Sequence, residues 1–349
     1  MKPRLIVKRW TLAGESLPVP KGYDPTDYDY FYSKMQYRQY YYPIFDDDPF
    51  SITFNTILFG QTSFCVNLLG FYFIYGNNRL GNAIKAHLLS DTILRSLIGL
   101  TQIYFGSCLL NEHCLGMSDW PWSGALINQI VSALYFSAQI SVQLHELLIT
   151  LSRLFAISFD GVYYHHFSKG IWVQVIAILL IPLIPYTPTI GSLTNVYADL
   201  WTPAGNMYDP NRHSSERYTN GSFFDSLIYS IENIVLVAFL LALFTDIVTL
   251  YKVRERMEKS ESNAEQARAD IRLSLQMLII HSMNAFHWVF MRMPQMHTLF
   301  TDAVNTDEYI TRFAVTLVNV SGILNILLGF LMIYLNRPIK EKENPNIKT

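Results

Sequence analysis

Residues 223–251 read FFDSLIYSIENIVLVAFLLALFTDIVTLY, an almost unbroken run of apolar side chains. About 20 apolar residues in an α-helix cross the roughly 30 Å of hydrocarbon in a bilayer, so this stretch is long enough to span one. Of the 349 residues, 50% are hydrophobic and 15% are charged. An average soluble domain has about 25% charged residues. The composition therefore points to a protein embedded in lipid.

Six further stretches have a similar length and character, so the sequence predicts an all-α fold, a seven-transmembrane helix bundle. Several stretches contain charged or polar residues, which is typical of a multi-pass bundle with an internal polar site. The predicted spans are approximately Ile52–Tyr75, Ala86–Leu110, Ala125–Phe159, Ile171–Ser192, Phe223–Tyr251, Leu273–Met293 and Ile310–Leu335.

Lys and Arg are distributed unevenly over the connections between these spans. The connection between the fifth and sixth spans is rich in them, whereas the one between the second and third spans has none. Because positive charge is retained on the cytoplasmic side, we expect the N-terminus outside and the C-terminus inside. The chain then divides into an extracellular segment (1–50), a membrane domain (51–336) and a cytoplasmic tail (337–349).

Two features are consistent with exposure of the second and fourth connections to the outside. Asn220-Gly221-Ser222 is an N-glycosylation sequon in the connection between the fourth and fifth spans. Cys108 and Cys114 flank the outer end of the second span. They either close a small loop by a disulfide bond in an oxidising compartment or remain two thiols.

A charged residue inside a span is expected to pair with an opposite charge, to bind a partner or to extend towards water. Asp91 and Arg95 are four residues apart, so they share a helix face and are expected to form a structural ion pair; a role in ligand or ion binding is the alternative. Arg153 falls at the cytoplasmic mouth of the bundle. There it either holds the inner ends of helices together or contacts a partner, or it extends towards water as an interfacial arginine.

Polar residues recur at helical spacing in the third, fifth, sixth and seventh spans. Each is explained either as an interhelical hydrogen-bonding group or as part of a polar cavity open to the outside. Glu232 favours the cavity, because a carboxylate within the membrane is costly unless it faces a cavity or a partner. The sixth span also contains His281, and the seventh contains Asn325. The candidate ligand-binding residues are Gln129, Ser132, Gln139, Glu232, Asn233, Asn284, His287, Trp288 and Asn319.

Several function classes lack their sequence signatures. The chain has no HExxH motif, no Gly-rich phosphate-binding loop and no Gly-x-Ser-x-Gly motif, so we expect no enzyme activity, no cofactor and no metal site. No lysine lies in the interior of a span, which excludes a retinal Schiff base. The net charge of −2 argues against nucleic-acid binding. Two halves of repeated hydropathy, typical of transporters, are not apparent.

Three short segments resemble the nematode serpentine chemoreceptors, which are divergent members of the G-protein-coupled receptor class. They are LSRLFAI at 151–157, ARADIRLSL at 267–275, which is similar to the serpentine gamma and related subfamilies, and IYLNRPI at 333–339. Two departures stand out. Ser152 replaces the acidic residue that precedes the arginine in rhodopsin-like receptors, and the connection between the fourth and fifth spans has no cysteine.

The resemblance implies a glycoprotein receptor of the plasma membrane, including that of sensory cilia. It would bind an external small-molecule ligand for sensory perception and signal to a heterotrimeric G protein inside the cell. The charges between the fifth and sixth spans would then either contact the G protein or form a solvated helix extension. A transporter or channel is the alternative. The residues expected to face the G protein are Arg153, Arg268, Arg272 and Arg337.

Overall fold

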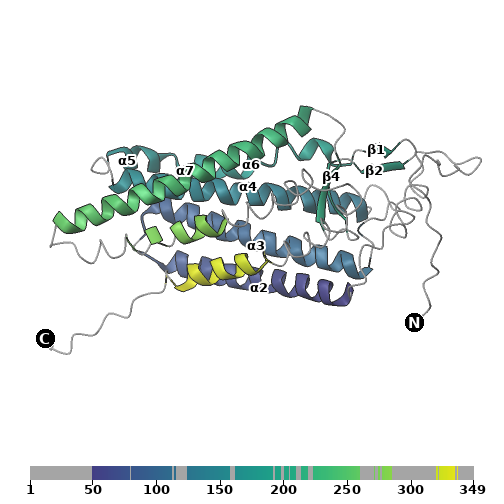
Figure 1. Ribbon diagram of the computed structural model, residues 1–349, viewed down its shortest axis with the longest axis horizontal. Helices are drawn as coiled ribbons and strands as arrows, with labels where there is room; N and C mark the ends of the chain where they lie inside the picture. The colour runs from purple at the N-terminus through teal and green to yellow at the C-terminus, as the bar shows by residue number, and fades with distance from the viewer. Residues whose placement is uncertain are drawn as a thin grey trace, which may run out of the picture.

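The computed structural model describes the central part of the chain as a bundle of helices that lie roughly along one axis (Figure 1). Helix α5 lies at one end of this bundle, and four short strands lie at the other. We refer to these as the α5 end and the hairpin end. The described residues are 49–78, 80–111, 114, 124–157, 162–191, 193–197, 200–203, 205–209, 214–218, 223–259, 271, 274–275, 277–284, 320, 322–334 and 336.

Helices from all seven predicted spans are present among these residues. In chain order they are α2 (Pro49–Gly76), α3 (Asn82–Asn111), α4 (Gly124–Ile157), α5 (Val162–Lys169), α6 (Ile171–Leu180), the 3-10 turn η3 (Thr187–Thr189), α7 (Phe223–Lys259), a helical stretch at 277–284 and a helix at Gly322–Tyr334.

Three helices of the described residues are long and apolar enough to cross a membrane: Thr53–Gly76, Gly124–Ile157 and Ser226–Glu255. They fall in the predicted first, third and fifth spans. Two shorter apolar helices, Ile171–Leu180 and Gly322–Tyr334, fall in the fourth and seventh. The structure thus supports helices that cross a membrane, and the full number of seven stays a prediction.

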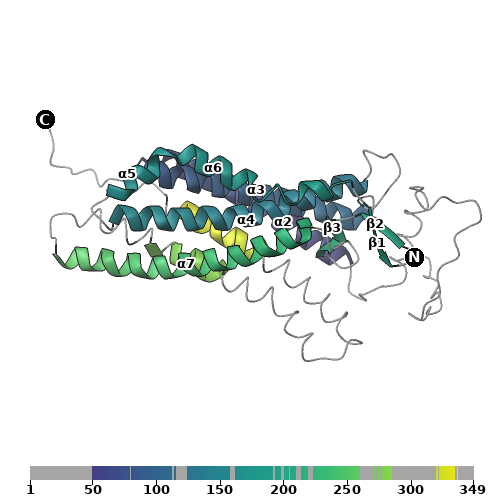
Figure 2. The same cartoon turned by 90° about the horizontal axis from the view of Figure 1, so that it is seen from above.

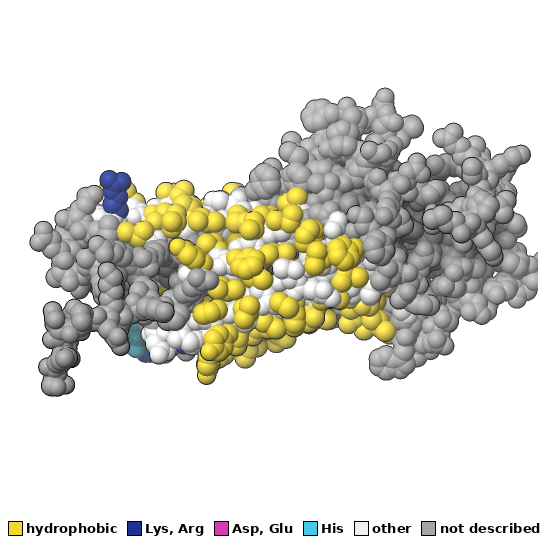
Figure 3. Space-filling view, turned by 90° about the horizontal axis from the view of Figure 1, so that it is seen from below, with side chains coloured by type: hydrophobic (Ala, Val, Ile, Leu, Met, Phe, Trp, Pro, Cys, Tyr) yellow, Lys and Arg dark blue, Asp and Glu magenta, His cyan; other side chains and the backbone are white. Residues whose placement is uncertain are grey.

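Large apolar side chains lie on the outside of the bundle as well as in its interior. Val173 of α6 is 72% exposed and Phe244 of α7 is 65% exposed, and similar residues project from α2. On the face drawn in Figure 3, apolar side chains form a broad band over the described helices. A soluble monomer rarely exposes a continuous apolar surface of this kind, whereas a bilayer provides the apolar surroundings that these residues need.

Helices α2 and α3 pack against each other through glycine. A Cβ atom placed on Gly60 would lie 2.8 Å from the carbonyl oxygen of Gly99, and one on Gly99 would lie 2.9 Å from the carbonyl oxygen of Gly60. The two backbones are therefore in direct contact at this crossing. Small residues at a crossing are the usual way in which membrane helices gain close packing, because the hydrophobic effect does not drive their association inside lipid.

Helix α6 ends at Leu180 and continues as turns through Tyr186. Pro182 and Pro185 follow the end of the helix, and proline has no backbone N–H to extend it. The turns end at Gly191, whose φ of 81° favours glycine.

The connection between α6 and α7 contains strands that the all-helical prediction did not include. Strands β1 (Leu193–Tyr197) and β2 (Leu200–Pro203) form one antiparallel hairpin. Strands β3 (Gly205–Asp209) and β4 (Ser214–Tyr218) form a second. Each strand is only four or five residues long. Strands this short give too little periodicity to be recognised in the sequence.

Candidate functional site

Five ionisable side chains from four separate helical segments of the chain meet inside the bundle. Asp91 and Arg95 come from α3, Glu146 from α4, Asp246 from α7 and His281 from the helical stretch 277–284. None of the five is more than 2% exposed. We call this set the ionic cluster. Charged groups are costly in an apolar interior unless they are paired, so their partners decide what the cluster does.

Arg95 is the central cation of the cluster. Its Nε lies 2.9 Å from Asp91 Oδ2, which is the ion pair that the four-residue spacing predicts. Its Nη2 donates to Glu146 Oε1 on the neighbouring helix. Its Nη1 donates to Oδ1 of Asn325, 3.2 Å away. One guanidinium thus joins α3 to α4 and to the helix Gly322–Tyr334, using the planar fork of donors that only arginine provides.

Glu146 and His281 extend the cluster towards α7. The side-chain amide of Asn284 donates to both carboxylate oxygens of Glu146, at 2.9 and 2.7 Å. His281 Nε2 lies 3.7 Å from Glu146 Oε2, and His281 Nδ1 lies 2.5 Å from Asp246 Oδ2. The imidazole therefore stands between two carboxylates from different helices. Of the nine candidate ligand-binding residues, Asn284 is the one that the structure places in this cluster.

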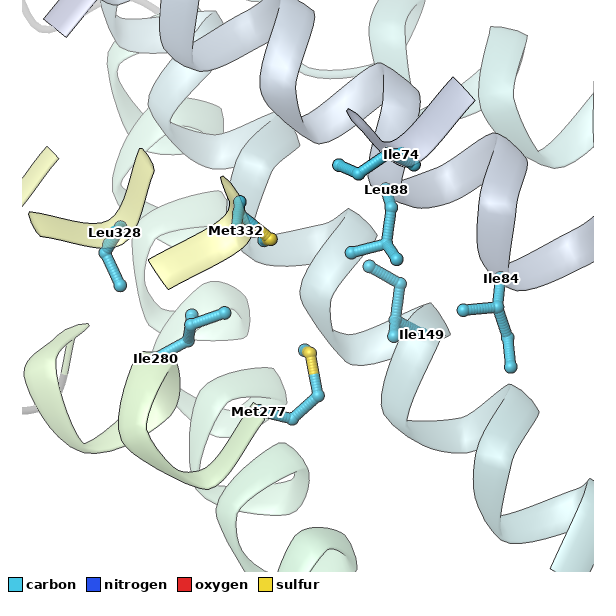
Figure 4. Packing of buried hydrophobic residues seen from close by; sticks show 8 residues of the cluster. All are labelled: Ile74, Ile84, Leu88, Ile149, Met277, Ile280, Leu328 and Met332. Atoms are coloured by element: carbon cyan, nitrogen blue, oxygen red, sulfur yellow. The ribbon is translucent and has the colours of Figure 1, made fainter. Parts of the chain in front are cut away.

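A layer of apolar side chains separates the ionic cluster from the α5 end. The apolar residues lie closer to the α5 end than the polar ones of the same helix: Ile149 follows Glu146 and Leu328 follows Asn325, whereas in α3, which runs the other way, Leu88 precedes Asp91. Figure 4 shows the side chains of this layer packed against one another between the helices. The apolar layer consists of Ile74, Ile84, Leu88, Ile149, Met277, Ile280, Leu328 and Met332.

Beyond the apolar layer, Arg153 of α4 closes the α5 end. Its Nη2 donates to Oγ of Ser274, which lies 121 residues later in the chain. Arg153 is 2% exposed and Ser274 is fully buried, so this arginine does not extend towards water. Of the roles that the sequence left open for Arg153, holding helix ends together is the one that this geometry fits.

Two further side-chain pairs join helices at the same end. His87 Nδ1 lies 2.9 Å from His145 Nδ1 and connects α3 to α4. The side-chain amide of Asn77 donates to Oδ1 of Asn336 at 3.0 Å, which connects the end of α2 to the end of the helix Gly322–Tyr334. The α5 end is therefore held by hydrogen bonds between helices in addition to the contact of Arg153 with Ser274.

At the hairpin end, Asn128 of α4 fastens strand β3. Its side-chain oxygen accepts from the backbone N–H of Tyr208 at 2.9 Å, and its amide donates to the Tyr208 carbonyl at 2.8 Å. The Tyr208 ring stacks on Phe105 of α3, with the ring centroids 4.4 Å apart. Cys108 and Cys114 are buried in the same apolar cluster as thiols, not as a disulfide.

Two candidate ligand-binding residues take part in this attachment. Gln129 accepts the backbone N–H of Gly191 at 2.9 Å, and Ser132 donates to Oδ1 of Asn128 at 3.2 Å. Both are buried. Gln139 is half-buried on α4, and Asn233 is exposed on α7, away from the ionic cluster. The candidates that the structure places are thus spread over the hairpin end and the cluster and do not form one pocket.

The remaining candidates lie outside the described residues, and their predicted roles stay predictions. Glu232 belongs to α7, but its side chain is outside the described part. The others are the ligand-binding candidates His287, Trp288 and Asn319, the arginines Arg268, Arg272 and Arg337, and the glycosylation site Asn220.

Sequence reasoning did not select Glu146, Asp246 or His281 as site residues. A signal for two of them was available. Glu146 and Asp246 are carboxylates within long apolar runs and have no basic residue one turn away on their own helix. Such residues are expected to pair across helices or to serve a function. Across the described ranges, no group of three or more His, Cys, Asp or Glu residues is arranged to hold a metal ion.

No protein-family model and no curated protein matches this chain. Its function is therefore inferred from the geometry of the ionic cluster, the apolar layer and the contact between Arg153 and Ser274.

Proposed function

We propose that this protein is a seven-transmembrane, G-protein-coupled chemosensory receptor. An external small-molecule ligand binds towards the hairpin end, which faces outside, and a heterotrimeric G protein binds at the α5 end, which faces the cytoplasm. The observation that carries the proposal is the buried hydrogen bond from Arg153 to Ser274. It joins α4 to the start of the predicted sixth span at the end where a G protein would bind.

A receptor transmits a change of shape across the membrane without passing material through it. The arrangement suits this task, because an apolar layer and the Arg153–Ser274 contact both lie between the ionic cluster and the α5 end. A ligand shifts a receptor only if it binds one arrangement more tightly than another. Here the ligand would favour the arrangement in which Arg153 has left Ser274 and is accessible to the G protein.

The length of α7 supports a partner at the α5 end. Its apolar part is followed without a break by a polar, charged segment ending at Lys259. Figure 2 shows α7 running past the neighbouring helices at that end. Lys252 and Arg254 on this extension add positive charge where a cytoplasmic protein would dock.

The ligand site itself is proposed from the sequence. Glu232 and His287 are expected to face an outward-open cavity, so Glu232→Ala and His287→Ala should abolish the response to a ligand while surface expression stays unchanged. Unchanged dose-response curves for both variants would refute this position of the site.

A transporter or channel is the second candidate. The ionic cluster favours it, because ionisable residues inside a membrane often mark a path for ions or protons. Flux or current in liposomes that contain this protein alone would support this candidate and count against the receptor.

Ligand-free GTP loading of purified G proteins tests the receptor proposal without a known ligand. Ser274→Ala removes the acceptor of a hydrogen bond from a charged group, a contact worth about 1.5–3 kcal/mol. Basal GTP loading should therefore rise several-fold. Arg153→Ala should lose GTP loading altogether at equal surface expression.

Ser168→Ala is the matched control for Ser274→Ala. Ser168 also lies at the α5 end, but its hydroxyl donates to the backbone carbonyl of His165 in its own helix and makes no contact between helices in this hydrogen bond. Basal loading should be the same as in the unmodified protein. Equal GTP loading in all three variants and the unmodified protein, across a panel of G-protein α subunits, would contradict the proposal.

A further inference from the structure

We propose that the ionic cluster is a proton-binding site, in which the packed bundle holds His281 as an imidazolium ion between Asp246 and Glu146. The proton is released when the helical stretch 277–284 moves away from α4 and α7. The proposal does not depend on the receptor function, because it concerns what the packed helices bind and not what they signal to.

The cluster has an excess of negative charge, which an added proton reduces from −2 to −1. Asp91, Glu146 and Asp246 contribute three carboxylates, and Arg95 contributes one positive charge. With a neutral His281 the cluster has a net charge of −2. Protonating His281 reduces this excess, and no other charged group of the described residues faces the cluster. Uncompensated buried charge costs several kcal/mol per ion in real proteins, so proton uptake is strongly favoured.

The geometry of His281 indicates where the added proton is held. Nδ1 faces Asp246 Oδ2 at 2.5 Å, and Nε2 faces Glu146 Oε2 at 3.7 Å. A neutral imidazole has one N–H donor and one acceptor nitrogen, so one of its nitrogens would point a lone pair at a carboxylate. In the imidazolium ion both nitrogens carry an N–H, so Nδ1 donates to Asp246 and Nε2 directs a positive N–H, without a hydrogen bond, towards the Glu146 carboxylate.

Unsatisfied atoms provide a second, independent observation. His281 Nε2 is fully enclosed and lies beyond hydrogen-bond distance of any acceptor, although it is aimed at Glu146. Asp91 Oδ1 and Asp246 Oδ1 also have no hydrogen-bond partner while buried. Buried polar atoms are normally satisfied, and their exceptions concentrate at functional sites. The two carboxylate oxygens are acceptors that lack donors, so the cluster has more demand for protons than its own hydrogen bonds meet.

Proton binding is coupled to helix packing, because the groups that face His281 come from several helices. They are Asp246 of α7, Glu146 of α4, and Asp91 and Arg95 of α3; the ring of Phe239 on α7 also packs on the imidazole. Loss of the proton leaves carboxylates of α4 and α7 on either side of a neutral ring. The packed arrangement holds one proton more than the separated one, so raising the pH disfavours packing, by up to tenfold per pH unit.

Thermal unfolding of the full-length protein in lipid nanodiscs tests this linkage. The midpoint temperature should fall as the pH rises from about 6 to about 9, the range in which an extra proton on imidazole is lost. Asp246→Asn and His281→Asn should flatten this dependence. His165→Asn, which changes an exposed histidine of α5, should leave it as in the unmodified protein. Equal pH dependence in all four proteins would overturn the proposal.

A second measurement uses the unmodified protein, so it does not depend on whether a variant folds. Nitrogen NMR of the unmodified protein with labelled histidine should show one imidazolium signal that persists above the pH at which exposed histidines are neutral. In vesicles, a change of pH on the outer or on the inner side should make this signal disappear, and the side that acts identifies the proton source. A neutral His281 at every pH, with stability that instead follows the sodium concentration, would show that a bound cation balances the cluster and would refute the proton site.

Discussion

Arg95 Nη1 donates a hydrogen bond to Oδ1 of Asn325, 230 residues further along the chain. The same guanidinium binds Asp91 and Glu146, so one cation on α3 has partners on α4 and on the helix Gly322–Tyr334. Breaking a buried ion pair by removing one partner is far more costly than losing an exposed pair, because the remaining charge stays uncompensated. Helix packing across the bundle therefore depends on this residue.

Arg95→Met should be among the most destabilising single changes in the bundle. It keeps much of the side-chain volume but leaves Asp91 and Glu146 without their cation, at an expected cost of about 3–5 kcal/mol in the free energy of unfolding. Asp91→Asn should cost less, about 1–3 kcal/mol, because Arg95 keeps Glu146 as its partner. Denaturant titration in mixed micelles measures both. A larger loss for Asp91→Asn than for Arg95→Met would reverse the expected order.

Gly99→Ala should weaken the packing of α2 against α3. The added Cβ would lie 2.9 Å from both the carbonyl oxygen of Gly60 and the backbone nitrogen of Phe64, and neither backbone can yield easily. Overpacking of this kind costs about 1–3 kcal/mol. Gly76→Ala is the control, since no atom lies within 4 Å of its added Cβ. Thermal unfolding in nanodiscs should show a lower midpoint temperature for Gly99→Ala only. Equal midpoints for the two variants would mean that the crossing of α2 and α3 accommodates the added methyl group without loss of stability.

Asn128→Ala should release strand β3 from α4. The change removes the acceptor of the Tyr208 N–H and the donors to the carbonyls of Tyr208 and Cys114. Hydrogen exchange at the Tyr208 amide should become faster by about tenfold or more, since each lost bond is worth about 0.5–1.5 kcal/mol. Ser132→Ala, which removes only a donor to Asn128, should have a smaller effect. Unchanged exchange in Asn128→Ala would show that the ring stacking of Tyr208 and Phe105 is sufficient.

Tyr164 in α5 should make stability depend on alkaline pH. Burial raises the pKa of its hydroxyl, against a smaller opposing effect of a backbone hydrogen bond with Ala83. A raised pKa means that the folded state favours the neutral phenol. Its contribution is complete below the ordinary tyrosine value of about 10 and is lost as the pH rises above it. Tyr164→Phe should therefore reduce the loss of thermal stability between about pH 9 and about pH 11. If Tyr164→Phe loses as much thermal stability over this pH range as the unmodified protein, the loss comes from other ionisable groups.

The parts of the site that sequence could predict are the local ones. Asp91 and Arg95 form their pair because a helix places residues four apart on one face, whatever the rest of the chain does. The contacts of Glu146 with Arg95 and of Asp246 with His281 depend on how four helices are placed and rotated, which periodicity does not specify. Arg153 was expected at one mouth of the bundle, but its partner Ser274 could not be named for the same reason.

The location of the long helices followed from apolar length, whereas their ends did not: α6 ends at Leu180, before the prolines, and not at Ser192, the predicted end of the fourth span. The roles of individual polar residues were harder to predict. Gln129 and Ser132 lie on the expected stripe of α4, yet their hydrogen bonds fasten the backbone of a loop and its anchor Asn128. A polar stripe on a helix shows only that partners exist, and both a ligand and a neighbouring backbone meet that requirement.

The glycine crossing of α2 and α3 bears on how this protein can move. Because the two backbones pack closely at Gly60 and Gly99, we expect α2 and α3 to move together. Asp91 and Arg95 belong to that pair of helices, whereas Glu146, Asp246 and His281 do not. In the proposed change of shape, α2 and α3 would therefore stay in place as a pair, and α4, α7 and the stretch 277–284 would move relative to them.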